Sequence, residues 1–287
     1  DFVIYRMTQI EGILAFLVKN KQKKYALEII NDIKSLYPIK SLVILPIVNK
    51  MLNRASGIAY LTEYYLQKKY FPNKIENQVF CSNYQTLDLK QSYILKPKSY
   101  PKSLHRINMI HVANSIDNHN KGHKTVLKII KYLQEKEVDA NIVFVGSGTK
   151  IPYYKKLIEQ RGINKHVNFI GKIDDKYKLI QFMSGFDLFL FPSKSEGIGR
   201  VNIEAMAAGL PCLVSNTGGQ IELFDSDFLI DYKDYKGFGD RIITLMRTPK
   251  KLELASKKNL EGSKKFLAEN QYHIRRIFLS QLKKINE

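Results

Sequence analysis

Two glutamates and two glycines lie close together in the second half of the chain. Glu196 is followed by Gly197 and Gly199, and Glu204 comes eight residues after Glu196. A carboxylate accepts hydrogen bonds and can hold two neighbouring hydroxyls of a ribose, while glycines let the backbone approach a bulky ligand closely. These residue types predict a site for a phosphate-bearing ligand. The alternative is that both glutamates are ordinary surface carboxylates.

The segments around these residues are expected to place them at one edge of a parallel sheet. Residues 188–191 form a continuous apolar run that Pro192 ends, which is typical of a strand buried on both faces. A short helix is expected over 201–208, before a Gly-Leu-Pro stop, and residues 212–214 form the next apolar strand. In such a strand–helix–strand unit, the loop that carries Glu196 lies at the carboxyl end of its strand, where open α/β sheets bind ligands. The free amides at the start of the helix favour a phosphate there.

Further motifs follow in a specific order. Glu204 begins a Glu-Ala-Met triplet, Gly209 begins Gly-Leu-Pro, and Thr217 begins Thr-Gly-Gly, with Glu222 beyond it. Together with the Glu-x7-Glu spacing from Glu196, this order closely resembles the nucleotide-sugar site of retaining glycosyltransferase family 4, the group 1 glycosyl transferases.

The resemblance implies an enzyme that transfers a hexosyl group from a nucleoside diphosphate sugar to an acceptor hydroxyl, with retention of anomeric configuration. By the same resemblance, Glu196 would bind hydroxyls of the donated sugar and orient it, and Glu204 would bind the ribose. The backbone around Gly197, Ile198 and Gly199 would contact the sugar and the diphosphate.

Lys121 precedes a Gly-His pair at the expected start of a helix, where a cation is unfavourable unless an anion binds beside it. The family has a Lys-Gly at this point, and the resemblance implies that Lys121 grips the donor diphosphate and stabilises its charge during catalysis. The family commonly has Gly-Arg at the end of the preceding strand, whereas this chain has Ala113-Asn114. The missing Arg removes a bidentate phosphate clamp. A catalytic role for the nearby His119 or His123 is not favoured.

The remaining residues that are expected to bind the donor lie in three other loops: Gly146, Gly148, Gly171, Lys172, Thr217, Gly218 and Gly219. A lone Gly-Ser-Gly after a strand is a weak nucleotide-binding signal. The resemblance implies that the backbone of residues 170–172 reads the nucleotide base, although a tight turn explains the glycine there equally well. The Thr-Gly-Gly stretch would lie against the sugar and phosphate.

The composition is that of a soluble globular protein, with 44% hydrophobic and 25% charged residues. The formal charge of +19 favours anionic partners; an anionic membrane surface is preferred to nucleic acid, because no zinc-finger, RNA-recognition or aromatic-basic pattern is present. No apolar run is long enough to span a membrane and no signal-peptide pattern begins the chain, so we expect a cytoplasmic protein, peripheral on the inner membrane face. Cys81 and Cys212 are expected in the core, and neither a metal nor a cofactor is expected.

Apolar runs alternate with amphipathic stretches along the chain, which predicts an α/β protein with two Rossmann-like domains, the GT-B fold of the family. We expect a partial amino-terminal, acceptor-side domain with its linker at 1–104, a nucleotide-sugar-binding domain at 105–270, and a terminal helix at 271–287 that crosses back to the first domain. The chain begins without methionine on an apolar segment, so the amino-terminal domain is expected to be truncated. The resemblance is strong over residues 105–225 and rests on the fold pattern elsewhere.

Strands are predicted at 2–5, 25–30, 57–61, 79–81, 107–113, 141–145, 167–170 and 228–230, besides the two named above. Helices are predicted at about 9–20, 39–54 and 63–70, from 121, from 152, and at 174–183, 235–246, 249–270 and 271–284. Arg6, Glu28 and Asp32 lie at or beyond strand ends, where solvated positions are favoured over a role in a cleft.

The donor is expected to carry UDP or GDP. The acceptor is expected to be a glycan, a lipid-linked saccharide or a protein, in the synthesis of cell-surface polysaccharide, lipid-linked glycan or glycoconjugate. Two alternatives stay open: a nucleotide-sugar isomerase or phosphorylase on the same architecture, and a nucleotide-sugar-binding pseudoenzyme that is catalytically weak.

Overall fold

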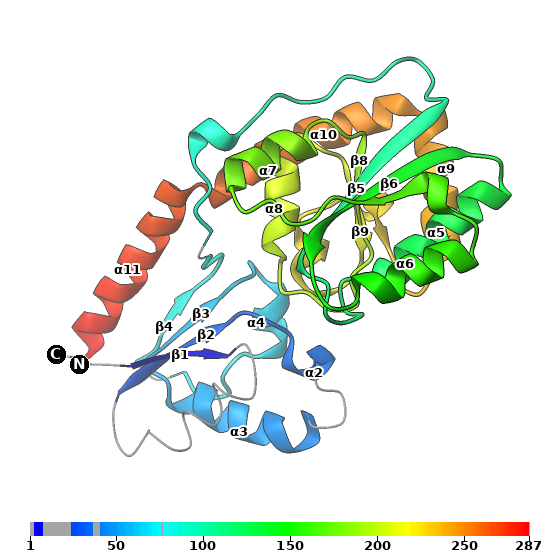
Figure 1. Cartoon of the computed structure of the whole chain (residues 1–287). Coiled ribbons are helices and arrows are strands. Elements are labelled where there is room, and N and C mark those ends of the chain that lie inside the picture. The colour runs from blue at the N-terminus through cyan, green and yellow to red at the C-terminus, as the bar shows by residue number, and fades with distance from the viewer. Residues whose placement is uncertain (1–2, 8–23, 37–40, 76, 86, 287) are drawn as a thin grey trace. The chain divides into compact units, whose positions relative to one another are not determined.

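The computed structural model describes residues 3–7, 24–36, 41–75, 77–85 and 87–286 (Figure 1). The chain forms two compact units. Unit 1 contains Asp1–Asp88, Ser195–Ile198 and Phe266–Glu287, and unit 2 contains Leu89–Lys194 and Gly199–Lys265.

Unit 1 is built on a parallel four-stranded sheet in the order β1-β2-β3-β4. Its strands are β1 (Val3–Met7), β2 (Tyr25–Ile29), β3 (Gly57–Tyr60) and β4 (Val79–Cys81). The helices of this unit are α2 (Ile33–Leu36), α3 (Ser41–Arg54), α4 (Tyr65–Lys69) and α11 (Ala268–Asn286). Because side chains alternate between the two faces of a strand, each face needs its own cover.

The two faces of this sheet have different covers. Leu27 and Ile29 of β2 belong to the core that includes Val48 and Met51 of α3. On the other face, small residues of β2 and β3 pack with two buried side chains of α11, Phe278 and Leu282. A Cβ at Gly57 would lie 2.6 Å from the Cδ2 atom of Leu282, so the glycine permits the close approach of this helix.

Unit 2 is built on a parallel six-stranded sheet in the order β10-β9-β8-β5-β6-β7. Its strands are β5 (Arg106–Ser115), β6 (Asp139–Ser147), β7 (Val167–Phe169), β8 (Leu188–Phe191), β9 (Cys212–Ser215) and β10 (Leu229–Ile230). Every residue of β8 and β9 is buried, as expected for strands that are covered on both faces.

Helices cover both faces of the second sheet (Figure 1). One group comprises α5 (His123–Glu135), α6 (Ile151–Gln160) and α9 (Tyr235–Arg247), and the other comprises α7 (Lys176–Met183), α8 (Arg200–Ala207) and α10 (Pro249–Ser263). The apolar positions expected at helical spacing in α5 are buried: Val126, Leu127, Ile129, Ile130 and Leu133.

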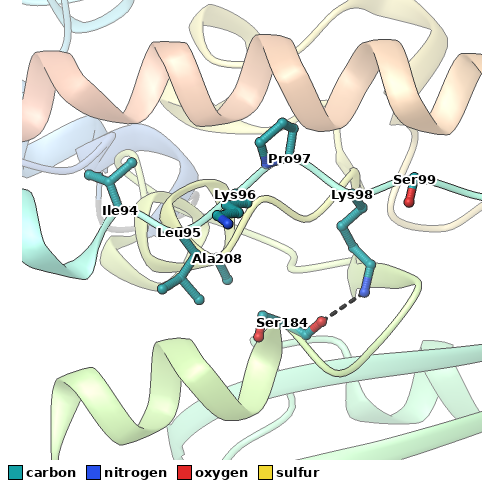
Figure 2. A pocket seen from close by; sticks show the side chains of 8 residues that line it. All are labelled: Ile94, Leu95, Lys96, Pro97, Lys98, Ser99, Ser184 and Ala208. Carbon is teal, nitrogen blue, oxygen red and sulfur yellow. Dashed lines mark hydrogen bonds between the residues drawn. The ribbon is translucent and has the colours of Figure 1, made fainter.

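Residues 94–99 run along unit 2 and line a shallow cavity of about 690 Å³ together with Ser184 and Ala208 (Figure 2). The Nζ atom of Lys98 donates to the carbonyl of Ser184 at 2.7 Å. Ser184 follows α7 and Ala208 follows α8, and both helices lead into the amino ends of strands. The cavity therefore lies at the amino ends of the strands. Ligands of such sheets bind at the opposite edge, outside the carboxyl ends.

Most predicted elements are confirmed within one or two residues, and the strand at 79–81 is confirmed at both ends. The single helix predicted over 249–270 is wrong: α10 ends at Ser263, a 3-10 turn follows, and α11 begins at Ala268. Gly262 and Ser263 are weak helix formers, and burial of Phe266 and Leu267 favours a change of direction there. The helix predicted at 9–20 lies outside the described residues.

Both cysteines are free thiols. Cys212 is buried in β9, which confirms its place in the core, whereas Cys81 at the end of β4 is only half-buried. Burial raises the pKa of the Cys81 thiol to about 11, so this group is a neutral thiol at physiological pH.

Candidate functional site

The strand order of unit 2 reverses at β5, which lies between β6 on one side and β8 on the other. The chain fills one half of the sheet with β6 and β7 and then returns to form β8, β9 and β10. Ligands of open α/β sheets bind outside the carboxyl ends of the strands at such a reversal. The loop after β5 carries Lys121, and the segment after β8 leads to Gly199 and Glu204 of the predicted site.

The loop that carries Lys121 is fixed to the end of β8. The backbone N–H of Lys194 donates to the carbonyl of Asn120 at 2.7 Å. Gly122 has a φ of +82°, and a Cβ there would lie 2.1 Å from the carbonyl oxygen of Pro192, so only glycine fits. The Nζ atom of Lys121 lies 5.9 Å from the centre of the Phe191 ring. The structure thus places Lys121 beside the end of β8, at the point where the strand order reverses.

β5 continues to Ser115, two residues further than predicted, and is irregular near its end. Its register with β6 shifts between Val112 and Ser115, in the segment that contains Ala113 and Asn114. Asn114 is exposed there. Bulges of this kind are common beside binding sites, because they redirect side chains at the end of a strand.

Gly146 and Gly148, which we predicted to bind the donor, are required for packing against the end of β5. A Cβ at Gly146 would lie 1.9 Å from the carbonyl oxygen of Ala113, and a Cβ at Gly148 would lie 2.6 Å from the backbone of Ile116. These contacts explain both glycines without a ligand. Donor binding by this loop stays a prediction.

His111 and His123 form a buried pair below the Lys121 loop. Their ring centres are 4.5 Å apart, and the Nδ1 atom of His111 shares a hydrogen bond of 2.9 Å with the carbonyl of Leu190. Burial, with smaller contributions from His119 and Lys121, lowers the pKa of His123 to about 4. His123 is therefore neutral at physiological pH and lies in the core. The Nδ1 atom of His119 shares a hydrogen bond of 2.8 Å with the hydroxyl of Tyr154.

The predicted base-reading segment follows β7 and is accessible. Ile170 is 39% exposed, and Gly171 has a φ of +81° with no atom within 4 Å of an added Cβ. Lys172 forms an ion pair of 2.5 Å with Asp174. The carbonyl of Gly171 accepts a hydrogen bond of 2.8 Å from the N–H of Gly146, which ties this turn to the end of β6.

α8 presents the predicted ribose carboxylate. Gly199 precedes the helix with a φ of +75°, and Glu204 lies on the fifth helical position with its side chain half-buried. Burial raises the pKa of Glu204 to about 7, although the positive charges of Lys176 and Arg200 oppose this shift. Burial removes water from this carboxylate, and hydroxyl donors of a ligand would replace the lost hydrogen bonds and stabilise its charged form. The raised pKa is thus consistent with the predicted binding role.

Glu196 lies in the segment Ser195–Ile198, which is grouped with unit 1. Its side chain is 7% exposed, and Ile198 is 1% exposed. Few glutamates are so deeply buried unless they have partners.

A network of buried polar side chains that we did not predict surrounds the Thr217-Gly218-Gly219 stretch. The two glycines and Gln220 lie in the 3-10 turn η3 (Gly218–Glu222), and all three are buried. The amide of Gln220 contacts residues at the ends of β8 and β9 and Asn202 of α8. Asn202, which lies between the apolar residues Val201 and Ile203 of α8, is the one sequence signal that could have indicated this network.

Of the three charged residues at strand ends of unit 1, Arg6 is exposed as predicted, but Glu28 and Asp32 are not solvated. Glu28 and Asp32 are buried, and Glu28 forms an ion pair of 2.6 Å with the Nε atom of Arg6. Asp32 accepts hydrogen bonds from the hydroxyls of Tyr70 at 2.6 Å and Tyr65 at 2.9 Å. These bonds, with one from a lysine of the same helix, tie the segment after β2 to α4.

Desolvation raises the pKa of Asp32, but the hydrogen bonds from Lys69, Tyr70 and Tyr65 and the charge of Lys69 outweigh it, so the net pKa is lowered. Asp32 is therefore a structural carboxylate of unit 1. Within the described residues, no three His, Cys, Asp or Glu side chains converge as metal ligands. None of the helices in the described part of the chain is long and apolar enough to cross a membrane.

Comparisons with known proteins identify the family of the chain. Protein CapJ of Staphylococcus aureus is 28% identical over 276 residues, which cover 91% of this chain and 68% of CapJ. The N-acetyl-alpha-D-glucosaminyl L-malate synthase of Bacillus anthracis is 29% identical over 181 residues, which cover 61% of this chain and 45% of that enzyme. The chain thus spans only part of the length of these relatives.

Among solved structures, Anabaena Alr3699/HepE in complex with UDP-glucose aligns with a TM-score of 0.69 at 18% identity, over 96% of this chain and 76% of that chain. The likeness shows the GT-B fold, with two Rossmann-like α/β units. The model of the glycosyl transferases group 1 matches residues 103–261, which are 159 of the 287 residues and include all six strands of unit 2 and the loops at their carboxyl ends. The chain therefore belongs to the glycosyl transferases group 1.

Proposed function

We propose that the protein is a retaining hexosyltransferase that takes its sugar from a nucleoside diphosphate donor bound at the carboxyl edge of unit 2. The observation that carries the proposal is the attachment of the Lys121 loop to the end of β8. The contacts from Asn120 to Lys194 and from Gly122 to Pro192 hold a cation where the strand order reverses. A diphosphate is the anion that suits this position.

The proposed chemistry breaks the bond between the anomeric carbon of the sugar and the diphosphate oxygen and joins that carbon to the oxygen of the acceptor hydroxyl, whose proton passes to the leaving diphosphate. Negative charge accumulates on the leaving diphosphate, and Lys121 with the amides at the start of α8 would stabilise it. Glu204 would accept hydrogen bonds from two ribose hydroxyls, and Glu196 would orient the donated sugar. The accessible backbone at Ile170 to Lys172 would contact the base.

UDP is the preferred nucleotide of this proposal, because the structurally similar Alr3699/HepE was solved with UDP-glucose. The acceptor would be the hydroxyl of a glycan, a lipid-linked saccharide or a protein. The formal charge of +19 supports attraction to the anionic inner leaflet of a membrane, and we propose that the enzyme works on the cytoplasmic side.

Calorimetric titration with UDP, GDP and ADP, alone and as their glucose or mannose derivatives, tests the donor site. We expect one nucleotide series to bind and Glu204→Ala to weaken it by about 1–3 kcal/mol, the usual cost of losing hydrogen bonds to a charged group. Glu159→Ala, on the exposed side of α6, is the matched control and should leave affinity unchanged. If no nucleotide binds, or if both variants bind equally well, the proposed donor site is wrong.

A binding protein without catalysis is the second candidate. The observation that favours it is Asn114 at the end of β5, where the family commonly has an Arg. Chromatography that measures UDP released by slow hydrolysis of UDP-glucose separates the two candidates. Hydrolysis above the enzyme-free rate supports the transferase, and NMR of the first-formed sugar reports whether its anomeric configuration is retained.

A further inference from the structure

Gln220 is the centre of the buried polar network at the carboxyl edge of unit 2. Its Nε2 atom lies 3.1 Å from both the carbonyl and the hydroxyl oxygen of Ser215, 3.1 Å from the hydroxyl of Thr217 and 3.3 Å from that of Ser193. Its Oε1 atom accepts a hydrogen bond of 3.0 Å from the Nδ2 atom of Asn202. One side chain thus bridges the ends of two strands and a helix.

The same strand ends are linked to each other. The hydroxyl of Ser215 donates to the carbonyl of Ser193 at 2.5 Å, and the hydroxyl of Thr217 donates to the same carbonyl at 3.2 Å. Ser193 comes directly before Lys194, whose N–H holds the loop of Lys121. Two sets of hydrogen bonds, one at Lys194 and one at the adjacent Ser193, therefore connect the Lys121 loop through the end of β8 to the turn at Thr217.

The network also reaches α8. Asn202 lies two residues before Glu204, so the bond from Asn202 to Gln220 fixes the helix that carries the proposed ribose carboxylate. Asn202, Gln220, Ser193 and Ser215 are all fully buried. Two apolar side chains would fill the space of Asn202 and Gln220 without the cost of desolvating two amides. The hydrogen-bonded pair therefore fixes the orientation and distance of α8 relative to the turn at Thr217 more than it stabilises the fold.

We propose that Gln220 and Asn202 are positioning residues for donor binding. On the function proposed above, three donor-binding segments must keep fixed relative positions: the Lys121 loop, the start of α8 and the turn at Thr217. The Gln220 amide is the shared partner that sets these positions. Neither side chain touches the donor.

The experiment compares stability and UDP affinity in a double-mutant cycle with Asn202→Leu and Gln220→Met. Each single change leaves a buried polar partner unsatisfied and should lower the Tm. The double change removes both partners of the bond between the two amides, so its Tm should lie above the value that the two single losses added together would give, while the contacts of Gln220 with Ser215 and Thr217 stay lost. The Kd for UDP should stay about tenfold or more above that of the unchanged protein, because binding would then also have to order segments that the amide pair holds in place beforehand.

The matched control is Asn259→Leu, the same change at another buried amide of unit 2. Asn259 donates to the carbonyl of Leu210 at 2.8 Å, next to the amino end of β9 and away from the proposed site. It should lower the Tm but leave the Kd for UDP unchanged. Thr217→Val, at a half-buried position, is a milder variant that should raise the Kd with little loss of Tm.

The outcomes separate this inference from the function on which it rests. If the unchanged protein binds neither UDP nor GDP, the proposed function is overturned and the inference with it. If the unchanged protein binds UDP and the Kd of each variant follows its Tm, so that the double variant recovers part of both, Gln220 and Asn202 are structural residues only. A double variant that recovers part of the Tm but not the affinity supports the inference.

Discussion

Replacement of Glu204 by glutamine should stabilise the unliganded protein at high pH and weaken nucleotide binding. The pKa of Glu204 is about 7 in the folded chain, against 4.5 for an unperturbed glutamate, because burial penalises its charged form. Glu204 therefore destabilises the folded state progressively as the pH rises from 4.5 to 7, and its full penalty applies above pH 7. At 1.36 kcal/mol per unit of pKa, the 2.5-unit difference gives at most about 3 kcal/mol.

The assay is the Tm of the unliganded protein and of Glu204→Gln, measured from pH 4.5 to pH 8.5. The two should have similar Tm values at the acid end, and the variant should gain about 2–4 °C per kcal/mol at the alkaline end. Glu159→Gln is the control, since this side chain is exposed on α6. Equal differences in Tm at both ends of the pH range would refute the reasoning.

The same variant should bind UDP more weakly at pH 8, because a neutral amide is a poorer acceptor for two ribose hydroxyls than a carboxylate. In the unchanged protein, UDP affinity should rise between pH 6 and pH 8 as Glu204 ionises, and this rise should be absent from Glu204→Gln. A gain in stability together with a loss of affinity is the expected signature of a group that is kept for binding.

Three further predictions follow from the geometry. Lys121→Ala should weaken UDP binding in calorimetry and reduce the salt dependence of that binding, whereas Lys124→Ala, exposed on the first turn of α5, should do neither. Gly122→Ala should lower the free energy of unfolding far more than Gly171→Ala. Both glycines have a positive φ, but only an alanine at position 122 would clash with a backbone carbonyl. Equal losses of free energy in urea unfolding would contradict this prediction. Asp32→Asn should destabilise the protein at pH 7 by about 1.5–3 kcal/mol, because the buried carboxylate that accepts from the Tyr65 and Tyr70 hydroxyls loses its charge. Since the pKa of Asp32 is lowered, the difference in urea midpoint should shrink as the pH falls below the ordinary pKa of an aspartate, and a difference independent of pH would count against this explanation.

Strands and helices of unit 2 could be predicted because their sequence signals are local. Continuous apolar runs such as 188–191 are typical of strands in a sheet with two covered faces, and the Gly-Leu-Pro stop at Gly209 fixes the end of α8. The order of motifs also identified the family. The irregular end of β5 could not be predicted, because its extension through Asn114 depends on pairing with Ser147 of a neighbouring strand.

Side chains whose role depends on distant partners were the least predictable. Asp32 and Glu28 look like solvated strand ends, and only the folded chain brings Tyr65, Tyr70 and Arg6 to them. Gly146 suggested a nucleotide loop, but its small size is already required by a carbonyl of β5. Sequence spacing predicts which residue types lie at a sheet edge. The role of each of these residues depends on hydrogen-bond partners that are distant in the sequence.

The segment of residues 94–99 has a consequence for autonomous folding. The N–H of Leu95 donates to the carbonyl of Ala207 at 2.9 Å, the N–H of Lys98 donates to Ser256 at 2.7 Å, and a Cβ at Gly209 would lie 2.3 Å from the carbonyl of Lys96. The Gly-Leu-Pro triplet is therefore a docking surface for this extended segment as well as a helix stop. A recombinant fragment that starts near residue 89 keeps the segment, whereas one that starts at 105 would leave these backbone groups without their partners and should aggregate more readily.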